Sequence, residues 1–426
     1  MPRDVRQNGI ADQAGHYFAR VIDSELAELF PHLGAIAIEG AKGVGKTTTA
    51  ERLAARVLRL DTAPDAALFK ADLGLLGRGP FPLLLDEWQR LPASWDQVRR
   101  LVDADATGGR YLLTGSAAPR GAPVHSGAGR IESLRMRPMT LAERGIGQPT
   151  VSMRELLAGQ AQVTGRTPVG LADYAREIVI SGLPAVRGLP ARPRRARLDG
   201  YLRRATTHEL IEQGIVAREP VRLMNWLRAY GAAVGTTATW NAIGRAASLG
   251  EANPVARATA ERYRDALSQL FLLEEVPAWR SGGAFAALGA GPKHYLADPA
   301  LAARLLGLDE PQLLGLRAAD LGRLFEALAA LSVLVFAQAA EARVEHLRTA
   351  KGGHEVDFIV TGHNAAVVAF EAKLTAAPDD RDAQHLAWLA AKLGSELADR
   401  VILTTGPYAY RRQDGIAVVP LALLGP

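Results

Sequence analysis

The chain has 426 residues, of which 48% are hydrophobic and 22% charged, and it carries a formal net charge of +5 at pH 7. This length predicts two or three domains, and the composition is typical of a globular chain and excludes a largely disordered one. Cysteine is absent, which excludes disulfides, thiolate metal sites and a cysteine nucleophile. The basic balance permits an acidic partner such as nucleic acid without establishing one.

No apolar stretch typical of a secretory signal follows the first residues, Met1 to Asn8. The longest apolar run, Leu328 to Ala340, is too short to span a bilayer and predicts a buried helix. We therefore expect a cytoplasmic protein with no membrane partner.

A glycine-rich segment follows a predicted strand at Ala35 to Ile38, and the residues from Thr48 to Leu60 predict a helix behind it. Strand, loop and helix together predict a phosphate-binding P-loop, in which glycines let backbone N–H groups face an anion. Within it, Lys46 is expected to reach the terminal phosphates and Thr47 to hold Mg²⁺ through its hydroxyl. A chance glycine turn is the bland alternative. The expected nucleotide contacts, for ATP or GTP, are Gly40, Ala41, Lys42, Gly43, Val44, Gly45, Lys46, Thr47 and Thr48.

Two further predicted strands end in polar residues. The apolar run from Phe81 ends in Asp86, expected in or next to the Mg²⁺ shell, and Glu87, expected to polarise the attacking water. The strand from Arg110 ends in Thr114 and Ser116. Either hydroxyl is expected to bind the γ-phosphate or the water, because the carboxyl ends of parallel strands meet at one edge.

Two basic features leave alternatives open. Arg130 follows a Gly- and Pro-rich stretch and is either a surface arginine or a group that stabilises the transition state, in its own subunit or a neighbour's. A dense arginine run is either a solvated helix face or a phosphate-contacting patch. It comprises Arg192, Arg194, Arg195, Arg197, Arg203 and Arg204.

The middle of the chain predicts three helices. The first carries Leu223 to Tyr230, the second runs from Trp240 to Ala247, and the third begins after Asn253-Pro254 and carries apolar residues up to Leu270. An apolar segment ending at Val276 follows, as in a winged helix-turn-helix. Such a module either reads DNA with its third helix or mediates packing and protein contacts.

Beyond residue 290 the pattern predicts a helix, three strands, a helix and a strand. The first helix, near Leu321 to Ala340, carries Glu326. Alternation puts Val356, Phe358 and Val360 on one face of a strand and Glu355 and Asp357 on the other, and it puts Glu371 and Lys373 on one face of the next strand.

The order of these motifs resembles the bacterial and archaeal AAA-type ATPases fused to a C-terminal domain of unknown function. Further matches are Arg20, Ser181-Gly182-Leu183-Pro184, and the run from Lys293 to Asp298. The Asp…Glu-x-Lys arrangement resembles the PD-(D/E)XK nuclease superfamily. That resemblance implies that Asp357, Glu371 and the helix-borne Glu326 bind Mg²⁺, and that Lys373 orients the water or stabilises developing charge. An inactive scaffold with a surface ion pair is the alternative.

Taken together, the sequence predicts an α/β chain with three domains. They are a P-loop ATPase sheet with a helical lid (1–218), a winged-helix-like domain (219–285) and a PD-(D/E)XK-like domain (286–426). The expected function is ATP hydrolysis coupled to DNA, with ATP and Mg²⁺ as cofactors and DNA as partner. The alternative is a regulatory or scaffold ATPase whose C-terminal domain binds a protein. The resemblance also admits a homo-oligomer.

Overall fold

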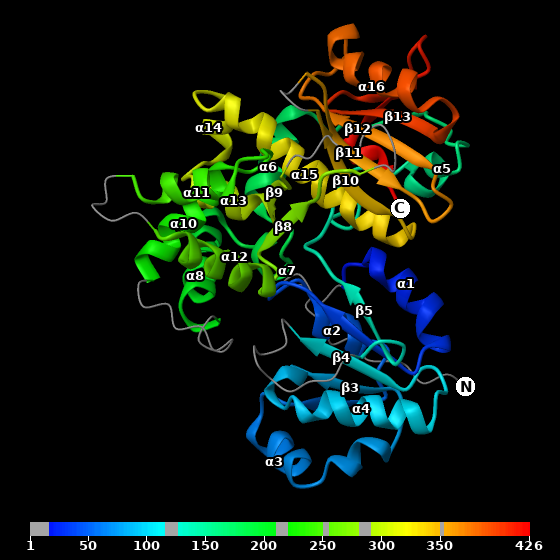
Figure 1. Ribbon diagram of the computed structural model, residues 1–426, viewed down its shortest axis with the longest axis vertical. Helices are drawn as coiled ribbons and strands as arrows, with labels where there is room; N and C mark the ends of the chain where they lie inside the picture. The colour runs from blue at the N-terminus through cyan, green and yellow to red at the C-terminus, as the bar shows by residue number, and fades with distance from the viewer. Residues whose placement is uncertain (1–16, 116–126, 210–219, 250–254, 281–290, 350–352) are drawn as a thin grey trace.

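The computed structural model describes residues 17–115, 127–209, 220–249, 255–280, 291–349 and 353–426. One β-sheet lies at each end of the elongated molecule, and the helices of the middle of the chain lie to one side between them (Figure 1). This arrangement agrees with the predicted α/β class. In the described part of the chain, no helix is both long enough and apolar enough to cross a membrane.

The N-terminal sheet is parallel, with strand order β2-β3-β4-β1-β5. Its apolar strands are almost fully buried, as expected for a parallel sheet covered on both faces. The three strands predicted here are confirmed as β1, β3 and β4. The strand bounds are β1 Ala35–Glu39, β2 Arg56–Arg59, β3 Leu83–Asp86, β4 Tyr111–Gly115 and β5 Ile131–Arg135.

Helices cover both faces of this sheet. α1 (Val21–Leu29) and α2 (Lys46–Glu51) lie towards the rest of the molecule, whereas α3 (Ala63–Ala71) and α4 (Ala93–Ala104) cover the far face (Figure 1). Trp88, Trp95 and Phe69 belong to the apolar core on that far side. Short 3-10 helices are Phe30–His32, Leu73–Gly77 and Trp88–Arg90.

The prediction of one helix from Thr48 to Leu60 was wrong. Helix α2 ends at Glu51, and Arg56–Arg59 form β2, which pairs with β3 in parallel. Leu58 and Leu60 are buried in the far-face core. Tertiary pairing with β3 therefore decides the conformation of a short apolar segment that has no clear period of its own.

The middle module consists of three helices and a two-stranded antiparallel sheet. The predicted helices are confirmed as α10 (Pro220–Ala232), α11 (Trp240–Ala247) and α12 (Arg257–Gln269). Asn253-Pro254 lies outside the described residues. The strands are β8 (Leu273–Val276) and β9 (Lys293–Leu296). The β8–β9 pairing therefore crosses the predicted boundary at 285.

The C-terminal sheet has the order β10-β11-β12-β13-β15-β14-β7. It follows α15 (Ala318–Ala339), and α16 (Asp380–Leu393) connects β12 to β13. The predicted order of helix, three strands, helix and strand is therefore confirmed from α15 onward, whereas the strand and two helices between residue 290 and α15 were not predicted. Further bounds are β10 Arg343–Arg348, β11 Glu355–Thr361, β12 Val367–Ala372, β13 Leu397–Thr404, β14 Tyr408–Arg411, β15 Ala417–Pro420 and β16 Leu424–Gly425. Gly394–Glu396 and Leu421–Leu423 are 3-10 helices.

Both faces of this C-terminal sheet carry apolar cores. Phe358 and Val360 face the core that contains α15, whereas Val356 packs with Ile359 and the residues of α16. The prediction that Val356 shares the face of Phe358 and Val360 was therefore wrong. The register of β10 against β11 shifts between Glu345 and Leu347, a β-bulge next to Val356.

The segment between the two ends of the molecule is interleaved with the C-terminal strands. β6 (Val151–Ser152) pairs with β16, and β7 (Gly165–Arg166) pairs with β14. These two pairings cross the predicted boundary at 218. The other helices are α5 Met153–Leu157, α6 Leu171–Ile180, α7 Pro184–Arg187, α8 Ala191–Thr206, α13 Pro299–Leu305 and α14 Glu310–Leu314.

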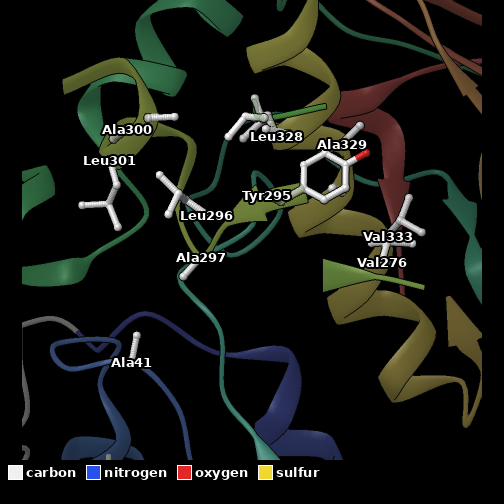
Figure 2. Close-up of a cluster of buried hydrophobic side chains, with 14 of the residues drawn as sticks. Ala41, Val276, Tyr295, Leu296, Ala297, Ala300, Leu301, Leu328, Ala329 and Val333 are labelled. Carbon is white, nitrogen blue, oxygen red and sulfur yellow. The ribbon is translucent and has the colours of Figure 1, made fainter. Parts of the chain in front are cut away.

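One large apolar core runs through the molecule. It includes Ala41 of the glycine-rich loop, Tyr295 and Leu296 of β9, and Leu328 and Val333 of α15 (Figure 2). It also takes in residues of α6, α8 and α10, and of the C-terminal strands. The parts of the chain are therefore not separate bodies joined by linkers.

Candidate functional site

The glycine-rich loop lies between the carboxyl end of β1 and the start of α2. Gly45 has φ 107°, a left-handed conformation that favours glycine. A Cβ at Gly40 would lie 2.1 Å from the carbonyl oxygen of Met136, so only glycine fits there. Val44 is fully buried and anchors the loop in the core. The sequence therefore builds a tight backbone turn at the sheet edge where ligands bind in α/β proteins.

The Lys46 side chain bends back over this loop. Its Nζ donates to the carbonyl oxygens of Gly40 at 2.8 Å and of Ala41 at 3.0 Å, and the residue is 7% exposed. Burial lowers the pKa of the Lys46 ammonium to about 8, with Arg135 acting in the same direction and Glu87 opposing. A buried ammonium held by main-chain carbonyls is poorly neutralised and favours an anionic ligand.

Two hydroxyl groups from neighbouring elements converge on one carboxylate oxygen. Oδ1 of Asp86 accepts hydrogen bonds from Oγ1 of Thr47 at 2.7 Å and from Oγ1 of Thr114 at 2.5 Å. The pairing of β3 with β4, which sets Asp86 opposite Thr114, creates this contact. Thr114 thus lies where the sequence led us to expect it, whereas Ser116 lies outside the described residues.

Glu87 follows Asp86 in a left-handed backbone conformation, with φ 56° and ψ 45°. Its Oε2 accepts a hydrogen bond from Nε2 of Gln89 at 2.5 Å. Left-handed backbone at a non-glycine residue costs free energy and is frequent at functional sites. This turn lies directly after the carboxyl end of β3, at the same edge of the sheet as the loop.

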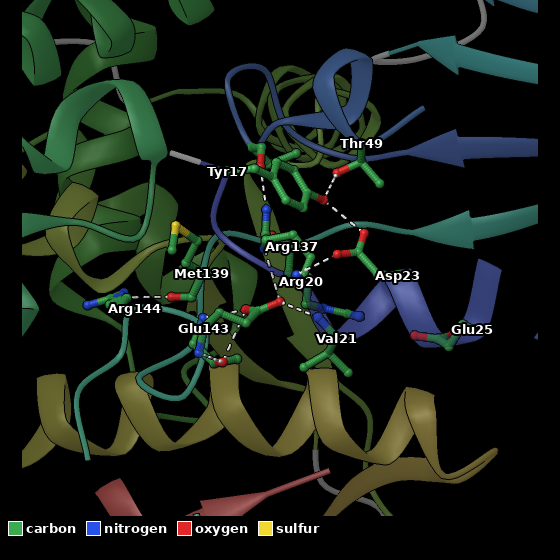
Figure 3. Close-up of polar contacts among 12 residues, drawn as sticks. Tyr17, Arg20, Val21, Asp23, Glu25, Thr49, Arg137, Met139, Glu143 and Arg144 are labelled. Atoms are coloured by element: carbon green, nitrogen blue, oxygen red, sulfur yellow. Dashed lines mark hydrogen bonds and ion pairs between the residues drawn. The ribbon is translucent and has the colours of Figure 1, made fainter. Parts of the chain in front are cut away.

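A buried guanidinium ties the loop to the segment after β5. Arg20 donates to the carbonyl oxygens of Val44 and Arg137, each at 2.7 Å, and forms an ion pair with Glu143 at 3.0 Å (Figure 3). Tyr17 lies beside it and contacts Thr49 of α2 at 2.8 Å. Arg20 was noted in the sequence without a role. Its hydrogen bonds connect the loop to the segment after β5.

Arg130 does not reach this site within its own chain. It precedes β5, and β5 runs parallel to β1 with Ile131 opposite Ala35, so Arg130 lies at the edge of the sheet away from the loop. There it forms an ion pair with Asp103 at 2.6 Å. Of the alternatives that the sequence left open, action within its own subunit is thus wrong, whereas a surface arginine and action on a neighbouring subunit stay open.

Arg135, at the other end of β5, lies opposite Glu39, just before the loop. Its Nη2 contacts Glu274 of β8 at 3.4 Å, and its guanidinium stacks on Phe271. Arg135 was not predicted as a site residue, although a parallel strand at residues 131–135 places it beside the loop.

A cavity of about 550 Å³ adjoins the loop. Lys42 and Gly43 line one side of it, and α7 and α8 supply the other, including Tyr201, Arg197 and Arg204. Lys42 also lies 3.6 Å from Glu209 at the end of this helical segment. Of the basic run, Arg197 and Arg204 therefore line this cavity beside the loop, and a lid role for α7 and α8 stays a prediction.

A second cluster of charged side chains lies on the C-terminal sheet. Nζ of Lys293 contacts Asp357 at 2.7 Å, Glu326 at 2.9 Å and Glu355 at 3.2 Å. Nearby, Nζ of Lys373 contacts Glu371 at 2.9 Å. Burial, with the charge of Asp357 next, raises the pKa of Glu326 to about 7 and raises that of Glu371 well above its usual value.

The structure brings the predicted residues Glu326, Asp357, Glu371 and Lys373 to one region but does not assemble the predicted metal site. No group of three or more metal-ligating His, Asp or Glu side chains is found among the described residues. The physical reason is Lys293, whose ammonium lies between the carboxylates. The sequence could not place it there, because β9 reaches this sheet only through tertiary packing.

Comparison with known families agrees with the first site. A family model described as "AAA domain" matches residues 33–144, which include the loop, β3 and β4. Residues 33–144 are an AAA-type P-loop ATPase domain. Two domains of unknown function follow, DUF8612 at residues 171–312 and DUF4143 at residues 321–424. The first of these covers the predicted boundaries at 218 and 285, in keeping with the interleaved fold around the ATPase domain.

Two curated relatives have no assigned function. They are the uncharacterized proteins Mb2031c of Mycobacterium bovis and Rv2008c of Mycobacterium tuberculosis, each 27% identical over 236 residues. The match covers 54% of this chain and 45% of each relative, so the ATPase-bearing chain matches only about half the length of these proteins.

Two solved structures are distantly similar, each at 14% identity. The Walker-type ATPase PABY2304 of Pyrococcus abyssi aligns with 68% of this chain and 96% of its own, at a TM-score of 0.40. The ORC2 protein of Aeropyrum pernix aligns with 70% and 92%, at a TM-score of 0.31. Likenesses of this strength carry no functional assignment.

Proposed function

We propose that this protein binds ATP together with Mg²⁺ and hydrolyses it. The observation that carries the proposal is the buried ammonium of Lys46, held over a glycine loop by two main-chain carbonyls. A triphosphate would supply the negatively charged partner that this ammonium lacks, and the backbone N–H groups of the loop would bind the remaining phosphate oxygens.

The other side chains of the site support hydrolysis. The hydroxyl of Thr47 and the carboxylate of Asp86 form a hard oxygen pair that fits Mg²⁺, which would neutralise charge on the phosphates. Glu87 accepts a proton from the attacking water once its carboxylate leaves the amide of Gln89. Thr114 holds Asp86 in place through its hydroxyl. Arg130 contributes only if a second copy of the chain presents it, which makes self-association part of the proposal.

The Glu87→Gln variant tests this function. We expect it to bind ATP as the unaltered protein does but to hydrolyse it about 10²- to 10⁴-fold more slowly, because it lacks a general base. Glu132→Gln, at an exposed position of β5, is the matched control and should retain full turnover. Unchanged hydrolysis by Glu87→Gln would remove Glu87 from the mechanism, and failure of the unaltered protein to bind ATP would remove the function.

A second proposal concerns DNA. Support comes from α12, the third helix of the middle module, whose Arg257 and Arg262 are exposed. Their hydrogen bonds within the described part of the chain run along the same helix, to Glu261, Ala258 and Thr259. We propose that the module is a winged helix-turn-helix and that these arginines contact DNA phosphates.

The DNA proposal predicts weaker binding and a shallower salt dependence when both arginines are replaced. Each lost phosphate contact lowers the slope of log affinity against log salt by about 0.9, so the Arg257→Ser/Arg262→Ser variant should lose nearly two units. Fluorescence anisotropy with duplex DNA measures this, with Arg100→Ser, exposed on α4, as control. Absence of any DNA response, in binding or in ATP turnover, would favour the alternative of a regulatory ATPase that docks a protein partner.

A further inference from the structure

Lys293 of β9 is 1% exposed, yet its charge lies among three carboxylates. Glu355 and Asp357 come from β11, and Glu326 comes from α15. Three elements that are distant in the sequence thus meet at one ammonium group. A fully buried lysine is stable only when it is paired in this way, so the cluster and the lysine depend on each other.

Several of the carboxylate oxygens that a divalent cation would need already have partners within the protein. Asp357 uses Oδ1 for Lys293 at 2.7 Å and Oδ2 for the backbone N–H of Ala372 at 2.9 Å. Oε1 of Glu326 accepts from the hydroxyl of Tyr295 at 2.5 Å as well as contacting Lys293. Oε2 of Glu371 faces Lys373, whereas its Oε1 is buried without a hydrogen-bond partner among the described residues.

A buried oxygen without a hydrogen-bond partner, such as Oε1 of Glu371, does not by itself make a site for Mg²⁺, which prefers about six oxygen ligands in an octahedral arrangement. The ammonium of Lys293 adds a repulsive charge at the place where the cation would lie. The residues therefore do not fit the metal that the nuclease resemblance implies.

We propose that Lys293 is the built-in counter-ion of this acidic cluster, in place of a divalent cation, so that the C-terminal domain carries no catalytic metal. The cluster instead fastens β9 to β11 and α15. β9 pairs with β8, and Glu274 of β8 forms an ion pair at 3.1 Å with Arg137, which lies in the segment after β5. The buried ions thus join the ATPase domain to the C-terminal sheet through the β8–β9 pair.

The first test compares Mn²⁺ binding by the full-length protein and by its Asp357→Asn variant, without nucleotide, by electron paramagnetic resonance. Any Mn²⁺ at Thr47 and Asp86 is common to both proteins. We expect identical binding curves up to millimolar Mn²⁺. Binding that disappears in Asp357→Asn would overturn the proposal, as would Mg²⁺-dependent DNA cleavage that disappears in the same variant. Neither result depends on ATP hydrolysis.

The second test removes the ammonium. In metal-free buffer, Lys293→Met should have a lower melting temperature than the unaltered protein, and it should gain a Mn²⁺ site that Lys293→Met/Asp357→Asn lacks. Lys392→Met, exposed at the end of α16, is the control and should change neither property. A folded Lys293→Met protein that gains no Mn²⁺ site would contradict the role given to Lys293. If this variant does not fold, the comparison with Asp357→Asn still decides.

Discussion

At the scale of single residues, we predict that the charge of Lys46 governs nucleotide affinity. Burial holds the pKa of its ammonium at about 8 in the free protein, and a bound triphosphate raises that pKa because it stabilises the charged form. Below pH 8 the lysine is already protonated and binds phosphate directly. Above pH 8 binding must first take up a proton. We therefore predict that ATP affinity falls as pH rises above 8, by up to about tenfold per pH unit.

Isothermal titration calorimetry measures this effect. At pH 9, the binding enthalpy should vary with the ionisation enthalpy of the buffer, because a proton is taken up, and at pH 7 this dependence should weaken. Lys70→Met, exposed on α3, serves as the control and should leave the pH profile unchanged. An affinity that stays constant between pH 7 and 9 would show that the ammonium of Lys46 does not carry the binding.

At the scale of elements, the sequence was informative wherever a local pattern suffices. The loop from Gly40 to Thr47 and the strands that end at Asp86 and Thr114 could be predicted, because glycine spacing and apolar runs with polar ends are local signals. The carboxyl ends of parallel strands share an edge, so the approach of Thr114 to Asp86 also followed.

Elements that depend on tertiary pairing escaped prediction. β2 was expected to be helical because Val57, Leu58 and Leu60 carry no period that distinguishes a short strand. Arg135 could be found only by recognising β5 as a parallel neighbour of β1. Lys293 enters the acidic cluster because β9 crosses from the middle module to the C-terminal sheet, a contact between positions 64 residues apart in the sequence.

At the scale of the whole molecule, contacts across the middle of the chain predict interdependent folding. The Ser181-to-Pro184 segment meets the Lys293-to-Asp298 run, since Asp298 accepts from the hydroxyl of Ser181 at 2.6 Å and from the N–H of Gly182 at 2.7 Å. Tyr174 is fully buried against Phe325, and its hydroxyl accepts from the N–H of Ala422 at 3.1 Å. The Ser181-to-Pro184 segment and the Lys293-to-Asp298 run, noted as separate motifs in the sequence, thus contact each other.

A fragment of residues 1–218 is predicted not to fold alone. It contains β6 and β7 without their partners β16 and β14, and it exposes the faces of α1 and α6 that pack against α15 in the large core. Exposed apolar faces and unpaired strand edges favour aggregation over a cooperative transition. Differential scanning calorimetry should give one cooperative transition for the full chain and none for the fragment, whereas co-expressed fragments 1–218 and 219–426 should purify as a complex. A soluble 1–218 fragment that melts cooperatively and binds ATP as the full chain does would contradict this prediction, because the ATPase domain would then fold without the rest of the shared core.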